Sequence, residues 1–318
     1  EGPPALALGA LFRERWRRGT GEAMLAPTLT AATEAWPEEV AADFRDIAVG
    51  LARTAPAWRG QPEVRENERL YLAAIAAARH CIYLESQYLT SPVIAEALGQ
   101  RLAEPDGPEI VLISTRHSPS YFDRLTMDRT RGVVLRRLRQ ADTGGRLKAY
   151  SPVTARGRAI IVHAKVAIID DRLLRVGSSN LNNRSTGLDS ECDLALEASR
   201  AADRQRIGGI RDRLVGHWLG VPGKAIADAV AASGGLGAAI EAFRGQGRER
   251  LVPIAATRAG PLSILIAAFH LGDPVSTADS WRPWTRRRVL RRDLMRAADR
   301  LALDRMPHPH DMAEEELV

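Results

Sequence analysis

Residues 163–170 have the sequence His-Ala-Lys-Val-Ala-Ile-Ile-Asp, and six residues separate Asp170 from Gly177-Ser178-Ser179-Asn180. The apolar residues around this block predict a strand over 159–169. Side chains alternate along a strand, so His163 and Lys165 should share one face, about 6–7 Å apart. Asp170 falls on the opposite face and is expected to serve as an ion-pair or turn residue at the strand end.

The residue types in this block fit the handling of a phosphate group. Lys165 supplies a fixed positive charge for phosphate oxygens, while Ser178 and Asn180 offer neutral hydrogen bonds. A histidine that attacks phosphorus or protonates a leaving oxygen needs an acceptor on its other ring nitrogen. Glu191 is the expected acceptor for His163. The cationic side chains neutralise the phosphate charge, so we expect no metal and no cofactor.

The block occurs only once, because no second His-x-Lys exists among the 318 residues. The block assembles most of one phosphate-handling half-site. Because the chain begins at Glu1 and not at Met, we expect a processed or excised piece of a longer protein.

Composition favours an anionic partner, because the formal charge is +6 and the computed pI is about 9.8. The alternative explanation is an Arg-for-Lys composition, since Lys148, Lys165 and Lys224 are the only lysines. The apolar stretch 262–271 is far shorter than the roughly 20 residues of a membrane span. We therefore expect no transmembrane segment and favour a cytoplasmic or peripheral membrane protein. Cys81 and Cys192 are expected to be buried free thiols.

Alternating helical and strand patterns predict an α/β fold, with a mixed β-sheet covered by helices on both faces and followed by a mainly helical C-terminal extension. The sequence divides into a helical and extended connecting segment (1–61), an α/β lobe with the motif (62–220) and a helical, Arg-rich extension (221–318). Residues 21–61 are predicted to form a long, loosely structured crossing. The predicted helices are 4–20, 62–80, 92–104, 128–141 and 201–217; the other predicted strands are 81–85, 109–114, 147–150, 173–176 and 192–197.

At these residues the chain resembles the phospholipase D superfamily, whose signature is H-x-K-x4-D followed by G-S-x-N. The resemblance covers about 62–200 and includes Tyr83–Tyr88 and Ser178–Ser185. The opening Gly2-Pro3 and Phe12–Trp16 resemble the segment after the first signature of bacterial two-lobed enzymes, which implies that the chain is a C-terminal lobe. In this superfamily two such motifs form one active site. The resemblance therefore implies that the other half comes from a missing N-terminal lobe or from a second copy of the chain.

The resemblance implies a phosphodiesterase that acts on glycerophospholipids, by hydrolysis or transfer, through a phosphohistidine formed on a partner histidine. His163 would be the acid/base and Glu191 its orienting residue, with Lys165 and Asp170 completing the catalytic set. Ser178 and Asn180 would line the substrate pocket, as would Gln87, whose alternative role is that of a polar strand-end residue.

Three alternatives share these residues: a homodimeric single-motif nuclease, a cardiolipin-synthase-like phosphatidyltransferase and a non-catalytic lobe that binds phosphate or headgroups. Nucleic acid is the less favoured partner, because only 5% of residues are aromatic and available for base stacking.

Outside the block, two tryptophans lie within an arginine cluster, Trp281 and Trp284 with Arg282–Arg292. This cluster could contact an anionic membrane or form a solvated helix. His117 is expected to be a solvated loop residue, and His308 and His310 to be tail residues.

Overall fold

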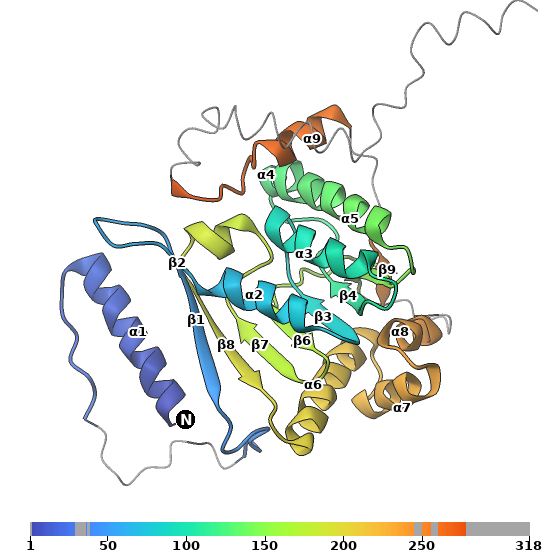
Figure 1. The fold of residues 1–318 in the computed structure, drawn as a ribbon, viewed down its shortest axis with the longest axis horizontal. Coiled ribbons are helices and arrows are strands. Elements are labelled where there is room, and N and C mark those ends of the chain that lie inside the picture. Colours follow the sequence, from blue (N-terminus) through green and yellow to red (C-terminus); the bar gives the residue numbers. More distant parts are fainter. Residues whose placement is uncertain (1, 29–35, 37–38, 245–249, 256–259, 278–318) are drawn as a thin grey trace, which may run out of the picture.

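The computed structural model describes residues 2–28, 36, 39–244, 250–255 and 260–277 (Figure 1). Its centre is one mixed sheet of nine strands in the order β2-β1-β8-β7-β6-β3-β4-β5-β9. Only the β3-β4 and β4-β5 pairs are parallel. The strands are β1 Val49–Ala55, β2 Val64–Arg65, β3 Cys81–Glu85, β4 Glu109–Ile113, β5 Leu147–Pro152, β6 Val166–Ile169, β7 Leu173–Gly177, β8 Glu191–Glu197 and β9 Leu251–Pro253.

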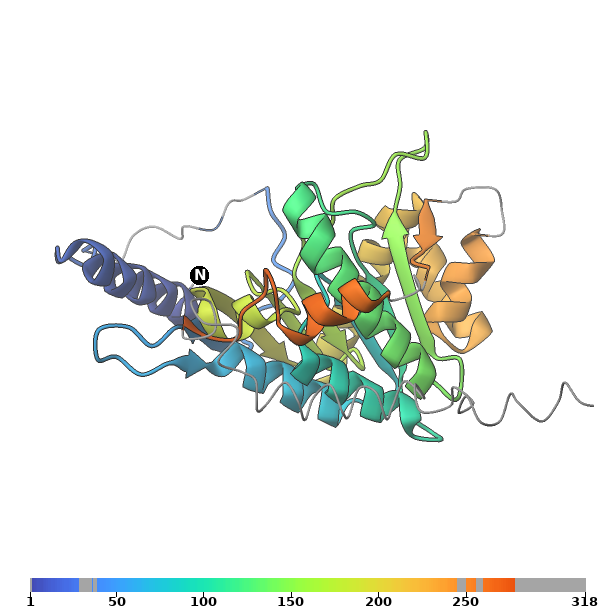
Figure 2. The same cartoon turned by 90° about the horizontal axis from the view of Figure 1, so that it is seen from above.

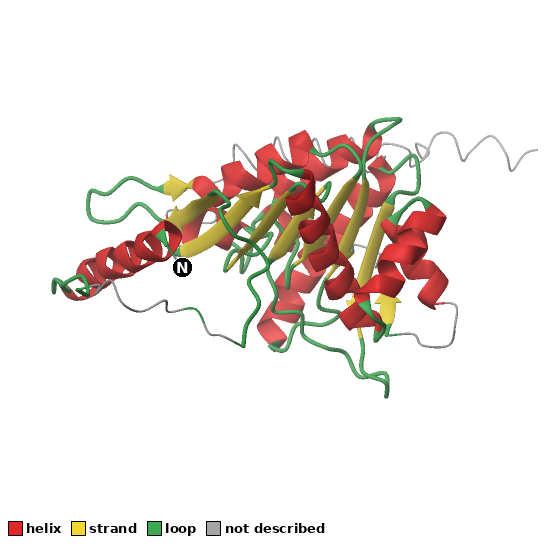
Figure 3. Cartoon of the chain, turned by 90° about the horizontal axis from the view of Figure 1, so that it is seen from below, coloured by secondary structure: helices red, strands yellow, loops and turns green. Residues whose placement is uncertain are grey.

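Helices cover both faces of the sheet, which confirms the predicted α/β class (Figures 1 and 3). Ile82 and Leu84 of β3 pack beneath α2, α3 and α5, whereas Tyr83 between them packs beneath α6, α7 and α8. Period-two alternation in a strand buried on both sides explains this division. The helices are α1 Pro3–Thr20, α2 Glu66–Ala77, α3 Pro92–Ala103, α4 Tyr121–Asp123, α5 Arg129–Ala141, α6 Ala201–Leu219, α7 Gly223–Ser233, α8 Leu236–Arg244 and α9 Pro261–Ala268.

Three parts of the chain differ from the sequence prediction. Part of 21–61, predicted to be loosely structured, forms β1, which pairs along its length with β8. The predicted helical extension contributes β9 to the far edge of the sheet. β6 begins at Val166 and not at residue 159, because the preceding segment leaves the ladder. There the backbone N–H of Val162 donates to the Thr115 hydroxyl at 2.9 Å.

Asp170 lies at the end of the sheet opposite to Lys165. It adopts a left-handed φ of 53° in the turn between β6 and β7, and its carboxylate accepts the backbone N–H groups of Arg79, His80 and Cys81 at 2.6–2.8 Å. Asp170 therefore anchors the start of β3 to the β6–β7 turn. These contacts agree with a turn residue, although they join backbone groups and form no ion pair.

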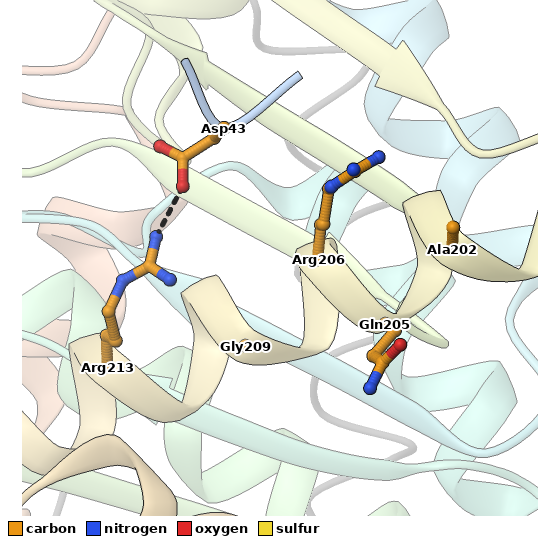
Figure 4. Close-up of a pocket in the computed structure, with 6 residues that line it drawn as sticks. All are labelled: Asp43, Ala202, Gln205, Arg206, Gly209 and Arg213. Atoms are coloured by element: carbon orange, nitrogen blue, oxygen red, sulfur yellow. Dashed lines mark hydrogen bonds and ion pairs between the residues drawn. The ribbon is translucent and has the colours of Figure 1, made fainter. Parts of the chain in front are cut away.

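Several surface features lie away from the motif. A shallow pocket on the outer face of α6 is lined by Arg206, Gly209 and Arg213, and Arg213 pairs with Asp43 at 2.9 Å (Figure 4). Among the described helices, no single one is long and apolar enough to cross a membrane, but the sharply bent pair of α7 and α8 reaches that length and composition together. The Trp281/Trp284 arginine cluster, His308 and His310 lie outside the described residues.

The face beneath α6 encloses a carboxyl group at the end of β3. Glu85 is buried, and its Oε1 accepts the hydroxyl of Tyr83 at 2.5 Å and the indole N–H of Trp218 at 2.9 Å. Desolvation by burial raises the pKa of Glu85 above its ordinary value. Burial therefore disfavours the charged carboxylate relative to its state in the unfolded chain.

This raised pKa predicts how Glu85→Gln changes stability with pH. Because the folded-state pKa exceeds the unfolded value, the contribution of Glu85 to stability is present at acid pH and is lost as pH rises through the folded pKa. The amide that replaces the carboxyl group keeps an oxygen for both donors and carries no charge. We expect the variant to be more stable than wild type at pH 8, with the difference shrinking toward pH 4 in urea unfolding. A pH-independent difference would contradict the buried-charge explanation.

Candidate functional site

The motif residues meet at one end of the sheet, where β3, β4, β5 and β7 end and β6 and β8 begin. The Lys165 carbonyl accepts the Gly177 N–H at 3.2 Å, and Ser178 N–H donates to the Cys192 carbonyl at 3.2 Å. The loop after β7 is thereby held between the segment before β6 and the start of β8. We refer to the gathered side chains as the half-site: His163, Lys165, Ser178, Asn180 and Glu191.

His163 and Lys165 lie in an extended segment just before β6. His163 is exposed, whereas its neighbour Val162 is fully buried. The Lys165 ammonium is mostly buried and donates to the His163 carbonyl at 2.7 Å. Burial lowers the pKa of Lys165, with Glu191 acting in the opposite direction. A partly desolvated cation thus lies against the backbone of the residue that carries the exposed imidazole.

A buried ion pair holds the Gly177–Asn180 loop. Arg175 of β7 and Asp193 of β8 are both almost completely buried and form a salt bridge, with Arg175 Nε donating to Asp193 at 2.8 Å. The other carboxylate oxygen accepts the backbone N–H groups of Ser178 and Ser179 at 2.9 and 3.1 Å. A Cβ at Gly177 would lie 2.0 Å from that oxygen, so the close approach requires glycine.

The same ion pair is enclosed by further polar groups. The Ser179 hydroxyl contacts both Arg175 and Asp193. The Arg175 guanidinium lies 4.3 Å from the centre of the Tyr71 ring, and the Asn67 amide, oriented to satisfy both of its atoms, donates to Asp193 at 2.8 Å. Helix α2 therefore takes part in fixing a loop more than a hundred residues later in the chain.

Glu191 lies beside this loop at the start of β8. Its carboxylate accepts the Ser178 hydroxyl, and burial raises its pKa. Between described residues no hydrogen bond joins Glu191 to His163, so its orienting role stays a prediction. Arg15 of α1 donates to the Glu191 carbonyl at 2.6 Å and adds a guanidinium beside the half-site.

Asn180 and Gln87 occupy neighbouring loops at this end of the sheet. Asn180 Oδ1 accepts the Ser86 hydroxyl at 3.2 Å, and the same hydroxyl oxygen accepts the Leu181 N–H at 3.2 Å. Gln87 is buried, and its carbonyl accepts the Ser114 hydroxyl at 3.2 Å. The loop after β3 therefore braces Asn180, whereas a contact of the Gln87 side chain with substrate remains a prediction.

A second carboxylate anchors the residues after Asn180. Asp273, just beyond α9, is buried and accepts the backbone N–H groups of Asn183 and Arg184 at 3.0 and 2.9 Å and the Thr90 hydroxyl at 2.7 Å. Burial raises the pKa of Asp273. The segment that contains α9 is thereby tied to the half-site.

Sequence reasoning did not identify Arg15, Arg175, Asp193 or Asp273. One signal was available for Asp193, because it lies two residues after Glu191 on the same strand and is a charged residue in an otherwise apolar run. Arg175 lies only two residues before Gly177, but its burial against Asp193 and Tyr71 comes from packing. Arg15 and Asp273 reach the site only through long-range packing. In the part of the chain that the structure describes, no cluster of three His, Cys, Asp or Glu side chains could hold a metal ion.

Part of the chain is similar to proteins of known family or structure. Residues 71–206 match the family model described as "Cardiolipin synthase, PLD-like domain". No curated protein sequence matches the chain. Similar solved structures are Nuc of Salmonella typhimurium, a phospholipase D family member (16% identity, 52% of this chain and 93% of that one, TM-score 0.35), NucT from Helicobacter pylori (16%, 50% and 92%, 0.36) and phosphatidylserine synthase of Haemophilus influenzae (14%, 73% and 46%, 0.40).

The buried ion pair predicts a large effect of Asp193→Ala. Removing the carboxylate leaves the Arg175 charge and two backbone N–H groups without their acceptor, which should cost about 3–5 kcal/mol in urea unfolding. Asp228→Ala, which removes an exposed ion pair with Lys224, is the matched control and should cost at most about 1 kcal/mol.

A double variant distinguishes the cost of an unpaired buried charge from the loss of the acceptor for the loop N–H groups. Arg175→Met/Asp193→Leu removes both charges and should recover most of the stability, yet it still lacks the acceptor for the loop N–H groups. Equal losses in Asp193→Ala and Asp228→Ala would contradict the anchoring role of the pair.

Proposed function

Because residues 71–206 match the model of a phospholipase D-like domain, we propose that this chain supplies one half of a phosphodiesterase or phosphatidyltransferase active site. The observation that carries the proposal is the exposed side chain of His163 in a segment whose Lys165 binds the His163 carbonyl and, through its own carbonyl, the start of the Gly177–Asn180 loop. One half-site holds one histidine. A second histidine must come from another lobe or from a second copy of the chain.

The chemistry then runs in two steps. The second histidine attacks phosphorus and the P–O bond to the leaving alcohol breaks, while His163 gives its proton to that oxygen. His163 next removes a proton from water or from an acceptor alcohol, whose oxygen attacks the phosphohistidine and releases the second histidine. Water yields a phosphomonoester, and an alcohol yields a new phosphodiester.

The remaining half-site residues stabilise charge and hold geometry. Lys165 places a partly buried cation near the non-bridging oxygens, where its field is less screened than in water. Ser178 and Asn180 offer neutral donors to the same oxygens, and Glu191 would orient His163. Asp170, which caps the opposite end of β6, acts on the site only through the position of that strand.

We further propose that the substrate is a glycerophospholipid. The description of the matching family model favours transfer to an alcohol as the second candidate reaction. The two reactions share every residue named above and differ only in the acceptor. Release of phosphatidic acid from phosphatidylglycerol in mixed micelles measures hydrolysis, and formation of cardiolipin from the same substrate measures transfer.

The proposal predicts that His163→Ala lowers turnover of phosphatidylglycerol and of bis(p-nitrophenyl) phosphate by about 100- to 10,000-fold, the usual contribution of an acid/base residue. His80→Ala is the matched control, because His80 is an exposed histidine at the opposite end of the sheet, and it should keep wild-type turnover. Unchanged turnover in His163→Ala would overturn the proposed role.

A further inference from the structure

Helix α9 turns two leucines toward solvent. Ser263 and Ile266 face inward, whereas Leu262 and Leu265 are about half exposed, and Leu271 beyond the helix end is also exposed. A helix that packs on a protein core normally turns its apolar side inward. Leu262 and Leu265, which lie three residues apart on this short helix, therefore indicate a surface that binds a partner.

A second exposed apolar feature lies on the neighbouring helical segment. In α4, Tyr121 is 81% exposed and Phe122 is 59% exposed. Helix α9 lies along α5 and the turn that follows α4 (Figures 1 and 2), and a Cβ on Gly272 would meet the side chain of Thr126 in that turn. We define Tyr121, Phe122, Leu262, Leu265 and Leu271 as the apolar platform.

Five exposed arginines lie in the segments that follow β4 and β5, at the end of the sheet that carries the half-site. Arg116, Arg124, Arg129, Arg156 and Arg158 are all exposed, and we define them as the cationic rim. The loop with Arg156 and Arg158 projects beyond the end of β5 (Figure 2), and no Asp or Glu occurs between Asp142 and Asp170. The acids near α4 are engaged: Asp128 binds Ser118 and Arg131, and Asp123 accepts the Tyr88 hydroxyl.

The platform and the rim are both connected to the half-site. Thr115, next to Arg116, is bonded to Val162, and His163 follows directly. Ile161, on the other side of Val162, is exposed like His163. On the α9 side, Asp273 holds the backbone of the loop after Asn180. Hydrogen bonds therefore tie the segments of the platform and the rim to the segments that carry His163 and Asn180.

We propose that the apolar platform and the cationic rim dock this chain onto an anionic phospholipid bilayer. Exposed leucines and aromatic rings enter the interfacial region, and the arginines meet lipid phosphates. A duplex nucleic acid would also attract the rim, but its phosphates offer nothing to exposed leucines, so charge and apolar surface together favour lipid. The inference deepens the proposed function, because the half-site would then work at a lipid surface.

Vesicle flotation tests the docking without any turnover, so its result is independent of the proposed chemistry. We expect the wild-type chain to bind phosphatidylglycerol vesicles and to bind phosphatidylcholine vesicles more weakly. Leu262→Ser/Leu265→Ser should weaken partitioning about tenfold or more, because two apolar side chains no longer enter the interface. Leu25→Ser/Val93→Ser, two exposed apolar residues outside the platform, should bind as wild type.

The rim has its own variant and control. Arg129→Ser/Arg158→Ser should weaken binding to phosphatidylglycerol about tenfold and reduce its salt dependence. Arg69→Ser/Arg204→Ser removes the same charge from other exposed positions and should have little effect. Equal loss in both charge variants would mean that net charge alone drives binding, and would overturn the proposal.

Other outcomes also contradict a lipid partner. Absence of wild-type chain from floated phosphatidylglycerol vesicles would contradict the proposal. Unchanged flotation of the Leu262→Ser/Leu265→Ser variant would contradict it too. Duplex DNA binding that is lost in Arg129→Ser/Arg158→Ser, without any vesicle binding, would assign the rim to nucleic acid. A change in oligomeric mass in the leucine variant, with vesicle binding intact, would assign the platform to a protein contact.

Discussion

The loop that carries Ser178 and Asn180 depends on the buried salt bridge between Arg175 and Asp193. Taking two charges out of water is costly, and hydrogen bonds to both charged groups offset part of that cost. Here Asp193 accepts two loop N–H groups as well as the guanidinium, and Arg175 also faces the Tyr71 ring. The pair ties the loop conformation to the core, because movement of the loop would leave one buried oxygen of Asp193 without its two backbone donors.

The elements with strong local patterns were predictable from sequence. Apolar runs with clear boundaries gave β3, β4, β7, α3 and α6 to within two residues, and the mixed sheet followed from their alternation. β1 was missed, because its partner β8 lies about 140 residues away and Val49–Ala55 has no strong pattern of its own. The start of β6 was placed too early, because a single hydroxyl, that of Thr115, diverts Val162 from the ladder.

The half-site was predictable as a set of residues but not as a geometry. Spacing identified His163, Lys165, Ser178 and Asn180, since all four come from one short stretch of chain. Their supports come from far away in sequence: Arg15 from α1, Ser86 from the loop after β3 and Asp273 from beyond α9. Contacts between residues so far apart in the chain leave no local pattern in the sequence. Asp170 is distant from His163 because it lies beyond the other end of β6, where its carboxylate caps the start of β3. The parity prediction assumed a strand through His163, whereas β6 begins only at Val166.

The half-site lacks a second histidine, because one exposed His163 cannot both form the covalent intermediate and protonate the leaving group. The most direct test measures molecular mass and phosphodiester turnover on the same chromatographic peak of the 318-residue chain. We expect any turnover to coincide with the mass of a dimer, or to appear only when a complementary lobe with its own histidine is added. Turnover that follows a monomeric peak of this chain alone would contradict it.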